Sequence, residues 1–178
     1  MLGVAMNPAS YTSYRYTLLM TILISSLFFL SNPASALPSD KEQPINVSAD
    51  KARKNGNQGL TIYEGNVVIT QGSIRITGDE VAIYDEAGTV SKMIAKGSKN
   101  QPAKFKQRPQ PEGTDMIANG ETIEYDINSE TLLLLESARL EQDGRITDSN
   151  KITYDMKSTV VNAGDSDGRV IMVIPPSK

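Results

Sequence analysis

The chain contains no cysteine and no histidine, and these absences remove most of the side chains that catalysis commonly uses. Without cysteine, no disulfide can stabilise the fold and no thiol nucleophile can form. Without histidine, a Ser-His-Asp triad is excluded, as are the usual zinc sites. Glu121, Glu124 and Asp143 lie in polar strand patterns and beside turns, which favours a solvated surface over an acid/base pair. The sequence therefore predicts a protein that is not an enzyme and that has no metal or cofactor.

Tryptophan is also absent, and aromatic residues make up only 6% of the chain. An interior built from this sequence must therefore consist mainly of slender valine, isoleucine and leucine side chains. An excess of basic charge is lacking as well, because 18 basic residues stand against 21 acidic residues and leave a net charge of −3. Domains that bind nucleic acid are typically basic, so nucleic acid is not predicted as a partner.

Residues 1–36 have the pattern of a secretory signal peptide. Arg15 precedes the apolar run at residues 17–30, and the small residues Ala34, Ser35 and Ala36 follow it. This order of a positive region, an apolar region and an A-x-A site is typical of export signals. An uncleaved membrane anchor is the alternative, although the apolar run is short for a bilayer span. We therefore expect cleavage after Ala36 and one exported domain at residues 37–178.

Residues 64–85, EGNVVITQGSIRITGDEVAIYD, alternate between polar and apolar side chains. The pattern breaks at Gly72 and at Gly78 and Asp79, which are turn-forming residue types. Alternation with a period of two is typical of short strands that place their aliphatic side chains on one face of a sheet. The chain beyond residue 36 shows no helical periodicity, so we predict an all-β domain of antiparallel strands.

Part of this stretch recurs later in the chain. RITGDEVAIYD at residues 75–85 and RITDSNKITYD at residues 145–155 share their first three and last two residues at identical spacing. Asparagine and aspartate favour turns, because their side chains can hydrogen-bond to nearby backbone. We predict tight chain reversals, rather than metal binding, at four such positions: Asp50, Asp79, Asn119 and Asn150.

The segment between Glu86 and Glu112 contains basic residues but no acidic one. Strand alternation places Lys104 and Lys106 on the face opposite to Phe105. A soluble outer face is the favoured interpretation, and contact with an anionic headgroup or an acidic partner is the alternative. The basic residues are Lys92, Lys96, Lys99, Lys104, Lys106 and Arg108.

Two segments are apolar on both faces of the predicted strands. They are TLLLLES at residues 131–137 and RVIMVIPP at residues 169–176. Such a strand is expected either to be buried on both sides or to meet a partner along an exposed face or edge. The second segment lies near the end of the chain, where an edge strand is expected.

Several motifs occur in the same order as in a known family. QPINVSAD after the predicted signal peptide, then EGNVVITQGSIRITGDEV, QPAKF and DSNKITYD, resemble the OstA-like family of periplasmic lipopolysaccharide transport proteins. The match runs from about Gln43 to Pro175. Each motif alone is weak, whereas the ordered set is specific.

The resemblance implies a twisted, V-shaped antiparallel β-jellyroll whose inner face is a hydrophobic groove. It also implies a periplasmic location and transport of lipopolysaccharide, with the lipid A acyl chains inside the groove and the sugars outside. Its expected partners are an inner-membrane-anchored component, an outer-membrane translocon and further copies of the chain, joined head to tail. A membrane-anchored relative of the family and a structural β-fibre subunit remain as alternative interpretations.

The resemblance places Ile45, Val47 and Phe105 at lipid-facing positions, and strand alternation extends the predicted groove to further residues. The complete predicted groove consists of Ile45, Val47, Ile62, Val67, Ile69, Ile74, Ile76, Val81, Ile83, Phe105, Ile123, Ile146 and Ile152. The predicted interface between copies consists of the first and last strands, that is Ile45, Asn46, Val47 and Ser48 together with Val170, Ile171, Met172, Val173 and Ile174. An exposed strand edge at each end would allow strand addition between copies.

Overall fold

Antiparallel β-strands form nearly all of the regular structure in this computed structural model, which describes residues 40–110, 112–166 and 168–176. The predicted signal peptide lies outside these described residues. No helix within them is long and apolar enough to cross a bilayer. The strands are β1 (Asn46–Ser48), β2 (Lys51–Asn55), β3 (Leu60–Gln71), β4 (Ile74–Glu86), β5 (Thr89–Lys96), β6 (Ala103–Gln107), β7 (Met116–Gly120), β8 (Thr122–Asp126), β9 (Thr131–Gln142), β10 (Arg145–Asp155), β11 (Val160–Ala163) and β12 (Ile171–Val173). The prediction of an all-β, antiparallel fold is confirmed.

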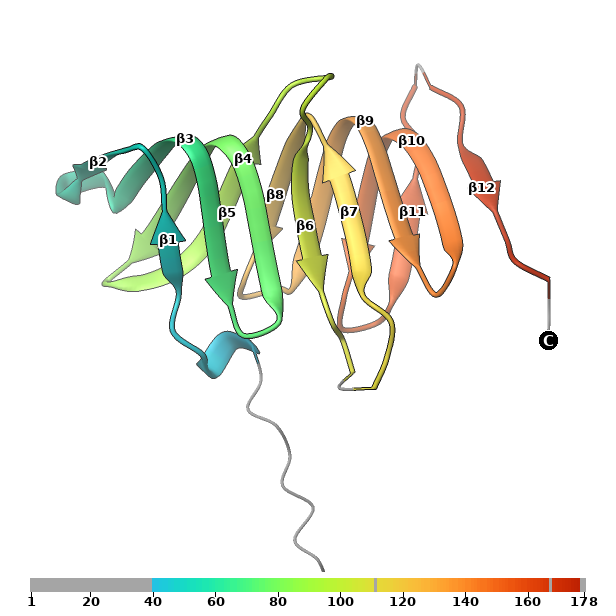
Figure 1. The fold of residues 1–178 in the computed structure, drawn as a ribbon, viewed down its shortest axis with the longest axis horizontal. Helices are drawn as coiled ribbons and strands as arrows, with labels where there is room; N and C mark the ends of the chain where they lie inside the picture. Colours follow the sequence, from blue (N-terminus) through green and yellow to red (C-terminus); the bar gives the residue numbers. More distant parts are fainter. Residues whose placement is uncertain (1–39, 111, 167, 177–178) are drawn as a thin grey trace, which may run out of the picture. The chain divides into compact units, whose positions relative to one another are not determined.

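The 12-stranded sheet folds over on itself into two layers (Figure 1). The front layer runs in the order β1, β3, β4, β6, β7, β9, β10 and β12. The back layer runs in the order β2, β3, β4, β5, β8, β9, β10 and β11. The long strands β3, β4, β9 and β10 belong to both layers, so each of them bends where it passes from one layer to the other.

The bends have local backbone causes. In β3, the pairing with β4 shifts register between Glu64 and Val67, and Gly65 and Asn66 there have φ angles of 80° and 44°. A β-bulge of this kind bends a strand sharply. The Asn66 side chain donates a hydrogen bond to Asp50 Oδ2 at 3.0 Å, and a Cβ on Gly65 would lie 2.3 Å from the same oxygen. Glycine therefore allows the bend of β3 to approach the link between β1 and β2.

The predicted chain reversals at Asp79 and Asn150 are wrong. The strand β4 continues through Asp79, pairing with β6 before it and with β5 after it. In the same way, β10 continues through Asn150, pairing with β12 first and with β11 afterwards. Turn-forming residues and a break in alternation are compatible with a bend as well as with a reversal, since both change which residues face inward.

The same correction applies to the two remaining predicted turn positions. Asp50 lies between β1 in the front layer and β2 in the back layer, and Asn119 lies near the end of β7, just before β8. The chain therefore crosses between the layers at both places instead of folding back beside itself. Hairpin turns occur elsewhere, for example at Gly72, which has a φ angle of 57° between β3 and β4.

A hydrophobic interior fills the space between the two layers. Its members are 8% exposed or less and come from both layers. Phe105 of the front layer meets Tyr125 of the back layer edge to face, with ring centroids 5.3 Å apart. Burial raises the pKa of Tyr125 to about 12, with smaller contributions from the nearby carboxylates of Glu130, Asp40 and Asp126. The tyrosine is therefore neutral over the physiological pH range.

Candidate functional site

Nine of the predicted groove residues line the interior between the layers. They alternate with outward-facing polar residues along their strands, as period-two patterning requires. The backbone brings together residues from β3, β4, β6, β8 and β10, which are far apart in the sequence. These nine buried residues are Val67, Ile69, Ile74, Ile76, Val81, Ile83, Phe105, Ile123 and Ile152.

Ile45 and Val47 lie at the β1 end of this interior. Both are half-buried and pack against the hydrophobic core. Val47 pairs with Ile69 of β3, whose side chain is completely buried, so Val47 faces the same inner side of the sheet. The interior therefore extends to the edge of the front layer at its N-terminal end.

Two predicted groove residues, Ile62 and Ile146, face the other way. In β3, Tyr63 is paired with the buried Val81, which leaves the neighbouring Ile62 on the outer face opposite Ala82. In β10, Thr147 is the buried residue and is paired with Leu140, so Ile146 also faces outward. The prediction was wrong because hydrophobicity was used to choose the inner residue, whereas the register with neighbouring strands decides it.

Several residues of the interior were not predicted individually. Leu132 and Leu134 face inward, while Leu133 and Leu135 lie half-buried on the outer face. The run TLLLLES carries apolar residues on both faces, so alternation within it could not distinguish the two sides. The other missed members include the small or flexible side chains Met93, Ala95, Ala103, Met116, Ala118, Ala138 and Leu140.

On one side the two layers are joined by the backbone of the bending strands, and on the opposite side they are not joined in this way. The bends lie along one side of the described unit, and most of the hairpin turns, such as those between β3 and β4 and between β9 and β10, lie along the other, the lower side in Figure 1. We call this second side the open rim. Residues 40–45, the N-terminal strap, follow the front layer along the rim, and Lys41 forms an ion pair with Glu130, which precedes β9 in the back layer. The strap thus links the two layers across the rim.

Four residues of the basic segment form ion pairs with acidic side chains on or beside neighbouring strands. Lys106 and Arg108 lie 2.6 and 2.9 Å from the Asp115 carboxylate. Hydrogen bonds from Lys106 and then Arg108 hold the pKa of Asp115 below its usual value. Lys92 pairs with Glu124 at 3.3 Å, and Lys96 pairs with Glu80 at 3.1 Å. These pairs support the interpretation of this segment as a soluble outer face.

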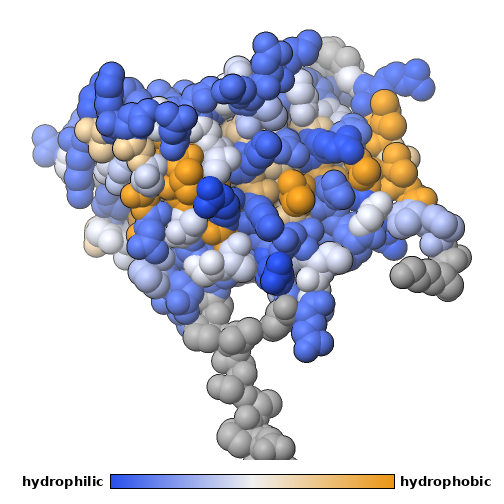
Figure 2. Space-filling view, in the orientation of Figure 1, coloured by the Kyte–Doolittle hydropathy of each residue, from blue (hydrophilic) through white to orange (hydrophobic). Residues whose placement is uncertain are grey.

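The first and last strands lie at opposite edges of the front layer. β1 pairs only with β3, and β12 pairs only with β10 among the described strands. Figure 2 shows apolar surface over β12 at one end and a second apolar area towards β1 at the other. Met172 is paired with Thr147, whose side chain is buried on the inner side, so Met172 continues the inner wall past β10. The predicted positions of the two edge strands are confirmed, whereas their contact with another copy stays a prediction.

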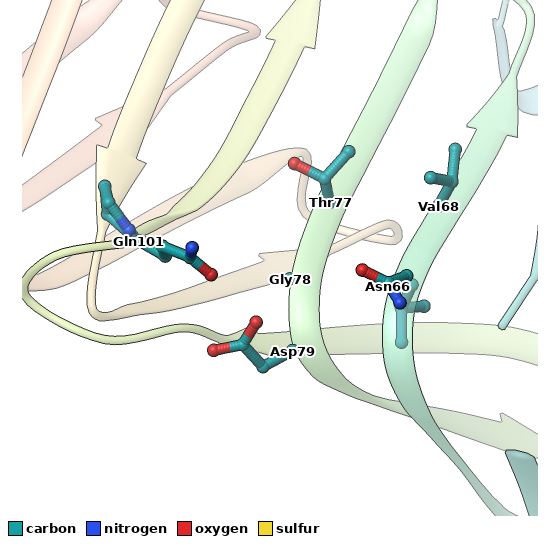
Figure 3. Close-up of a pocket in the computed structure, with 8 residues that line it drawn as sticks. Asn66, Val68, Thr77, Gly78, Asp79 and Gln101 are labelled. Atoms are coloured by element: carbon teal, nitrogen blue, oxygen red, sulfur yellow. The ribbon is translucent and has the colours of Figure 1, made fainter. Parts of the chain in front are cut away.

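A small cleft lies where β3 and β4 bend. Its volume is about 260 Å³, and Figure 3 shows the side chains of Asn66, Thr77, Asp79 and Gln101 around the backbone of Gly78. Mostly polar groups therefore surround this cleft, in contrast to the apolar interior. Val67, Val68 and Pro102 also line the cleft.

Comparisons by sequence and by structure match this chain to the same family of known proteins. The family model described as LptA/(LptD N-terminal domain) LPS transport protein matches residues 46–160. The lipopolysaccharide export system protein LptH of Pseudomonas aeruginosa is 38% identical over 157 residues, which cover 83% of this chain and 88% of LptH. The corresponding protein LptA of Escherichia coli K12 is 31% identical over 158 residues, which cover 88% of this chain and 84% of LptA.

A solved structure extends the likeness to the fold. The crystal structure of LptH, the LptA-homologous periplasmic component of the lipopolysaccharide transport device from Pseudomonas aeruginosa, superposes with a TM-score of 0.72 at 35% identity. The match covers 78% of this chain and 100% of the LptH chain. The two-layer arrangement described above is therefore shared with a relative whose structure is known.

Proposed function

Because the chain belongs to the LptA/(LptD N-terminal domain) family of lipopolysaccharide transport proteins, we propose that it carries lipopolysaccharide with the acyl chains sheltered between its two layers. It is a periplasmic component of lipopolysaccharide export. The family is one of transport proteins and not of enzymes, and we propose that this chain likewise performs no catalysis.

The observation that carries the proposal is the apolar interior itself, which runs from the edge strand β1 to β10, with the exposed apolar side chains of β12 beyond it. Each methylene group kept from water is worth about 0.8 kcal/mol, so exposing an acyl chain of about twelve carbons would cost on the order of 10 kcal/mol. A lipid that crosses an aqueous compartment therefore needs shelter along its whole path. Slender aliphatic walls provide this shelter without a deep minimum in the binding free energy, which would hold the lipid in one place.

Lipid entry requires the two layers to separate, because the interior is closed by its own side chains. The arrangement of the sheet favours separation at the open rim. Along the bends, continuous backbone joins the layers, whereas at the rim they meet through side chains and the N-terminal strap. The proposed opening is therefore a small hinge movement about the bends, with acyl chains replacing the contacts between the layers.

We further propose that the chain passes its lipid between partners through its two edges. One edge would meet an inner-membrane-anchored component and the other an outer-membrane translocon, either directly or through further copies of the chain. Strand addition at β1 and at β12 would keep the interiors of successive molecules aligned. Such a head-to-tail contact does not close on itself, so it can extend into a bridge of several copies.

A site-specific crosslinking experiment tests the proposed path. A photoreactive residue at Ile76 or Phe105 should capture lipopolysaccharide in cells, because both side chains are buried between the layers. The matched controls are Arg75 and Lys106, which neighbour them on the same strands and project outward. The captured lipid is identified by mass spectrometry of the adduct. Equal capture at inner and outer positions would contradict the proposed path.

A further inference from the structure

Two halves of the described chain have the same arrangement of strands. The first half runs from β1 to β6 and the second half from β7 to β12. In each half a pair of long strands, β3 with β4 or β9 with β10, carries two short strands in each layer. The front strands are β1 and β6 in the first half and β7 and β12 in the second. The back strands are β2 and β5 in the first half and β8 and β11 in the second.

The pairing registers of the two halves also agree. Tyr63 of β3 is paired with Val81 of β4. The residues 71 positions later, Leu134 of β9 and Ile152 of β10, are likewise paired with each other. This offset is one residue longer than the spacing of the RIT motifs in the sequence, so the register defines which residues of the two halves are equivalent.

The two halves join through one strand pair in each layer. In the front layer β6 pairs with β7, and the inward-facing Phe105 is opposite Ala118. In the back layer β5 pairs with β8, and the inward-facing Ala95 is opposite Ile123. All four side chains are 0–1% exposed, so this junction continues both walls of the interior.

The equivalents of these junction strands lie unpaired on one side at the two ends of the described fold (Figure 1). At one end they are β12 and β11, the equivalents of β6 and β5. At the other end they are β1 and β2, the equivalents of β7 and β8. Every residue of β2 is exposed, and Val160 and Val161 of β11 are 47% and 37% exposed. The large hydrophobic residues that are exposed in the described chain lie in β11, in β12 or directly beside β12.

We propose that successive copies of the chain join in both layers, with β11 of one copy paired to β2 of the next as β5 is paired to β8 within the chain. The inference rests on the proposed head-to-tail contact and adds a second strand pair to it. The internal junction shows which strands fit β11 and β12, namely the equivalents of β8 and β7, which are β2 and β1 of another copy. An isolated pair of short strands is marginal in water, so the back pair reinforces the β12 contact and does not replace it.

The internal junction also sets the register of the back pair. Ala95 and Ile123, which are opposite each other within the chain, have Ala163 of β11 and Ala52 of β2 as their equivalents. These two alanines therefore face each other across the contact. Ala163 packs against the hydrophobic core, so the pair continues the inner wall of the back layer from one copy to the next.

Charge gives this contact its direction. The strand β2 carries Lys51, Arg53 and Lys54, whereas β11 has no charged residue. Two β2 edges would repel each other, because like charges on directly opposite residues are destabilising. Lysine on an exposed edge is a common protection against indiscriminate strand pairing. A β2 edge accordingly favours β11, where the methylene groups of Lys54 cover Val161 and the ammonium group stays in water.

A disulfide across the back-layer contact tests the proposed register. Gly164 N–H donates to the Lys151 carbonyl oxygen at 2.9 Å, so Asn162, two residues earlier, also directs its backbone towards β10. It would face Arg53 of the next copy as a non-hydrogen-bonded pair, in which the Cα atoms are about 4.5 Å apart and a disulfide can form. The chain has no cysteine, so the Asn162→Cys and Arg53→Cys proteins carry one thiol each. Oxidation of their mixture should give a dimer that contains both variants, identified by mass spectrometry.

Asn55→Cys is the matched control for Arg53→Cys, because it lies on the same outer face of β2, about 7 Å further along the strand. All three positions are exposed, so the substitutions leave the core unchanged. The control mixture with Asn162→Cys should give roughly tenfold less of the linked dimer. Equal yields from the two mixtures would overturn the inference. Growth in light scattering without a disulfide between positions 162 and 53 would also overturn it and leave the contact through β12 standing. A wild-type protein that shows no concentration-dependent growth would contradict the proposed head-to-tail contact itself.

Discussion

Removal of residues 169–178 is expected to give a folded monomer that no longer forms oligomers and no longer supports lipopolysaccharide transport. The strand β12 pairs with β10 over only three residues, and the apolar side chains from Val170 to Ile174 are 41–69% exposed. Their loss therefore removes little of the buried core. It also exposes a different edge, that of β10, which lacks the apolar side chains that β12 presents to a neighbouring copy. A strand that is added between copies supplies both backbone hydrogen bonds and side-chain contacts, so its loss should abolish assembly.

Light scattering over a range of protein concentrations measures the effect on assembly. The matched control ends the chain after Ile174, which removes residues 175–178 and keeps β12. This control should assemble like the full-length exported domain, and both truncated proteins should keep their cooperative unfolding transition. The monomeric variant that lacks residues 169–178 should still bind lipid, because its interior is intact. The same concentration-dependent growth in both truncations would rule out β12 as the interface.

Linking the strap to the back layer is expected to prevent lipid loading. Lys41 and Glu130 form the ion pair that crosses the open rim. The chain contains no cysteine, so Lys41→Cys with Glu130→Cys would place the only two thiols of the protein at this point. A short bismaleimide between them would hold the rim closed at the β1 end. If the layers must separate there to admit acyl chains, the linked protein should show no lipid uptake above background.

The control for this experiment is the same double variant treated with a maleimide that carries a single reactive group. This reagent modifies both thiols and removes the ion pair without joining the layers. It should leave lipid uptake at the level of the untreated variant, as measured with purified lipopolysaccharide in a binding assay. Uptake by the linked protein equal to that of the control would show that lipid enters without opening of the rim at this end.

The sequence was sufficient to predict the class of fold and most of the interior, because alternation with a period of two is a direct consequence of strand geometry. It was not sufficient to decide which of two alternating sets faces inward. Ile62 and Ile146 are as hydrophobic as Ile69 and Ile152, yet their pairing with neighbouring strands turns them outward. Register is set by the hydrophobic patterns of both paired strands together with the turns between them, so the pattern of one strand alone does not decide it.

The bends were misread for a related reason. In β4 the inward residues Ile74 and Ile76 are followed, after Gly78 and Asp79, by Val81, which changes the inward set from even to odd positions. Locally, such a break resembles a turn between two short strands. Only the pairing with β6 on one side and β5 on the other shows that the strand continues. The burial of Gln71 could not be predicted either, because the strap that accepts its hydrogen bonds comes from residues about thirty positions earlier.

The central claim is that acyl chains lie between the two layers, and paramagnetic NMR on the methyl groups of isoleucine tests it most directly. The protein supplies its own controls, because isoleucines occur on both faces of the same sheet. A lipid with a nitroxide on its acyl chain should broaden the methyl signals of the inward residues Ile69, Ile76 and Ile152. The signals of the outward residues Ile62, Ile94 and Ile146 should broaden less, because their methyl groups point away from the space between the layers. Broadening of the outward set alone, or of both sets equally, would contradict the account.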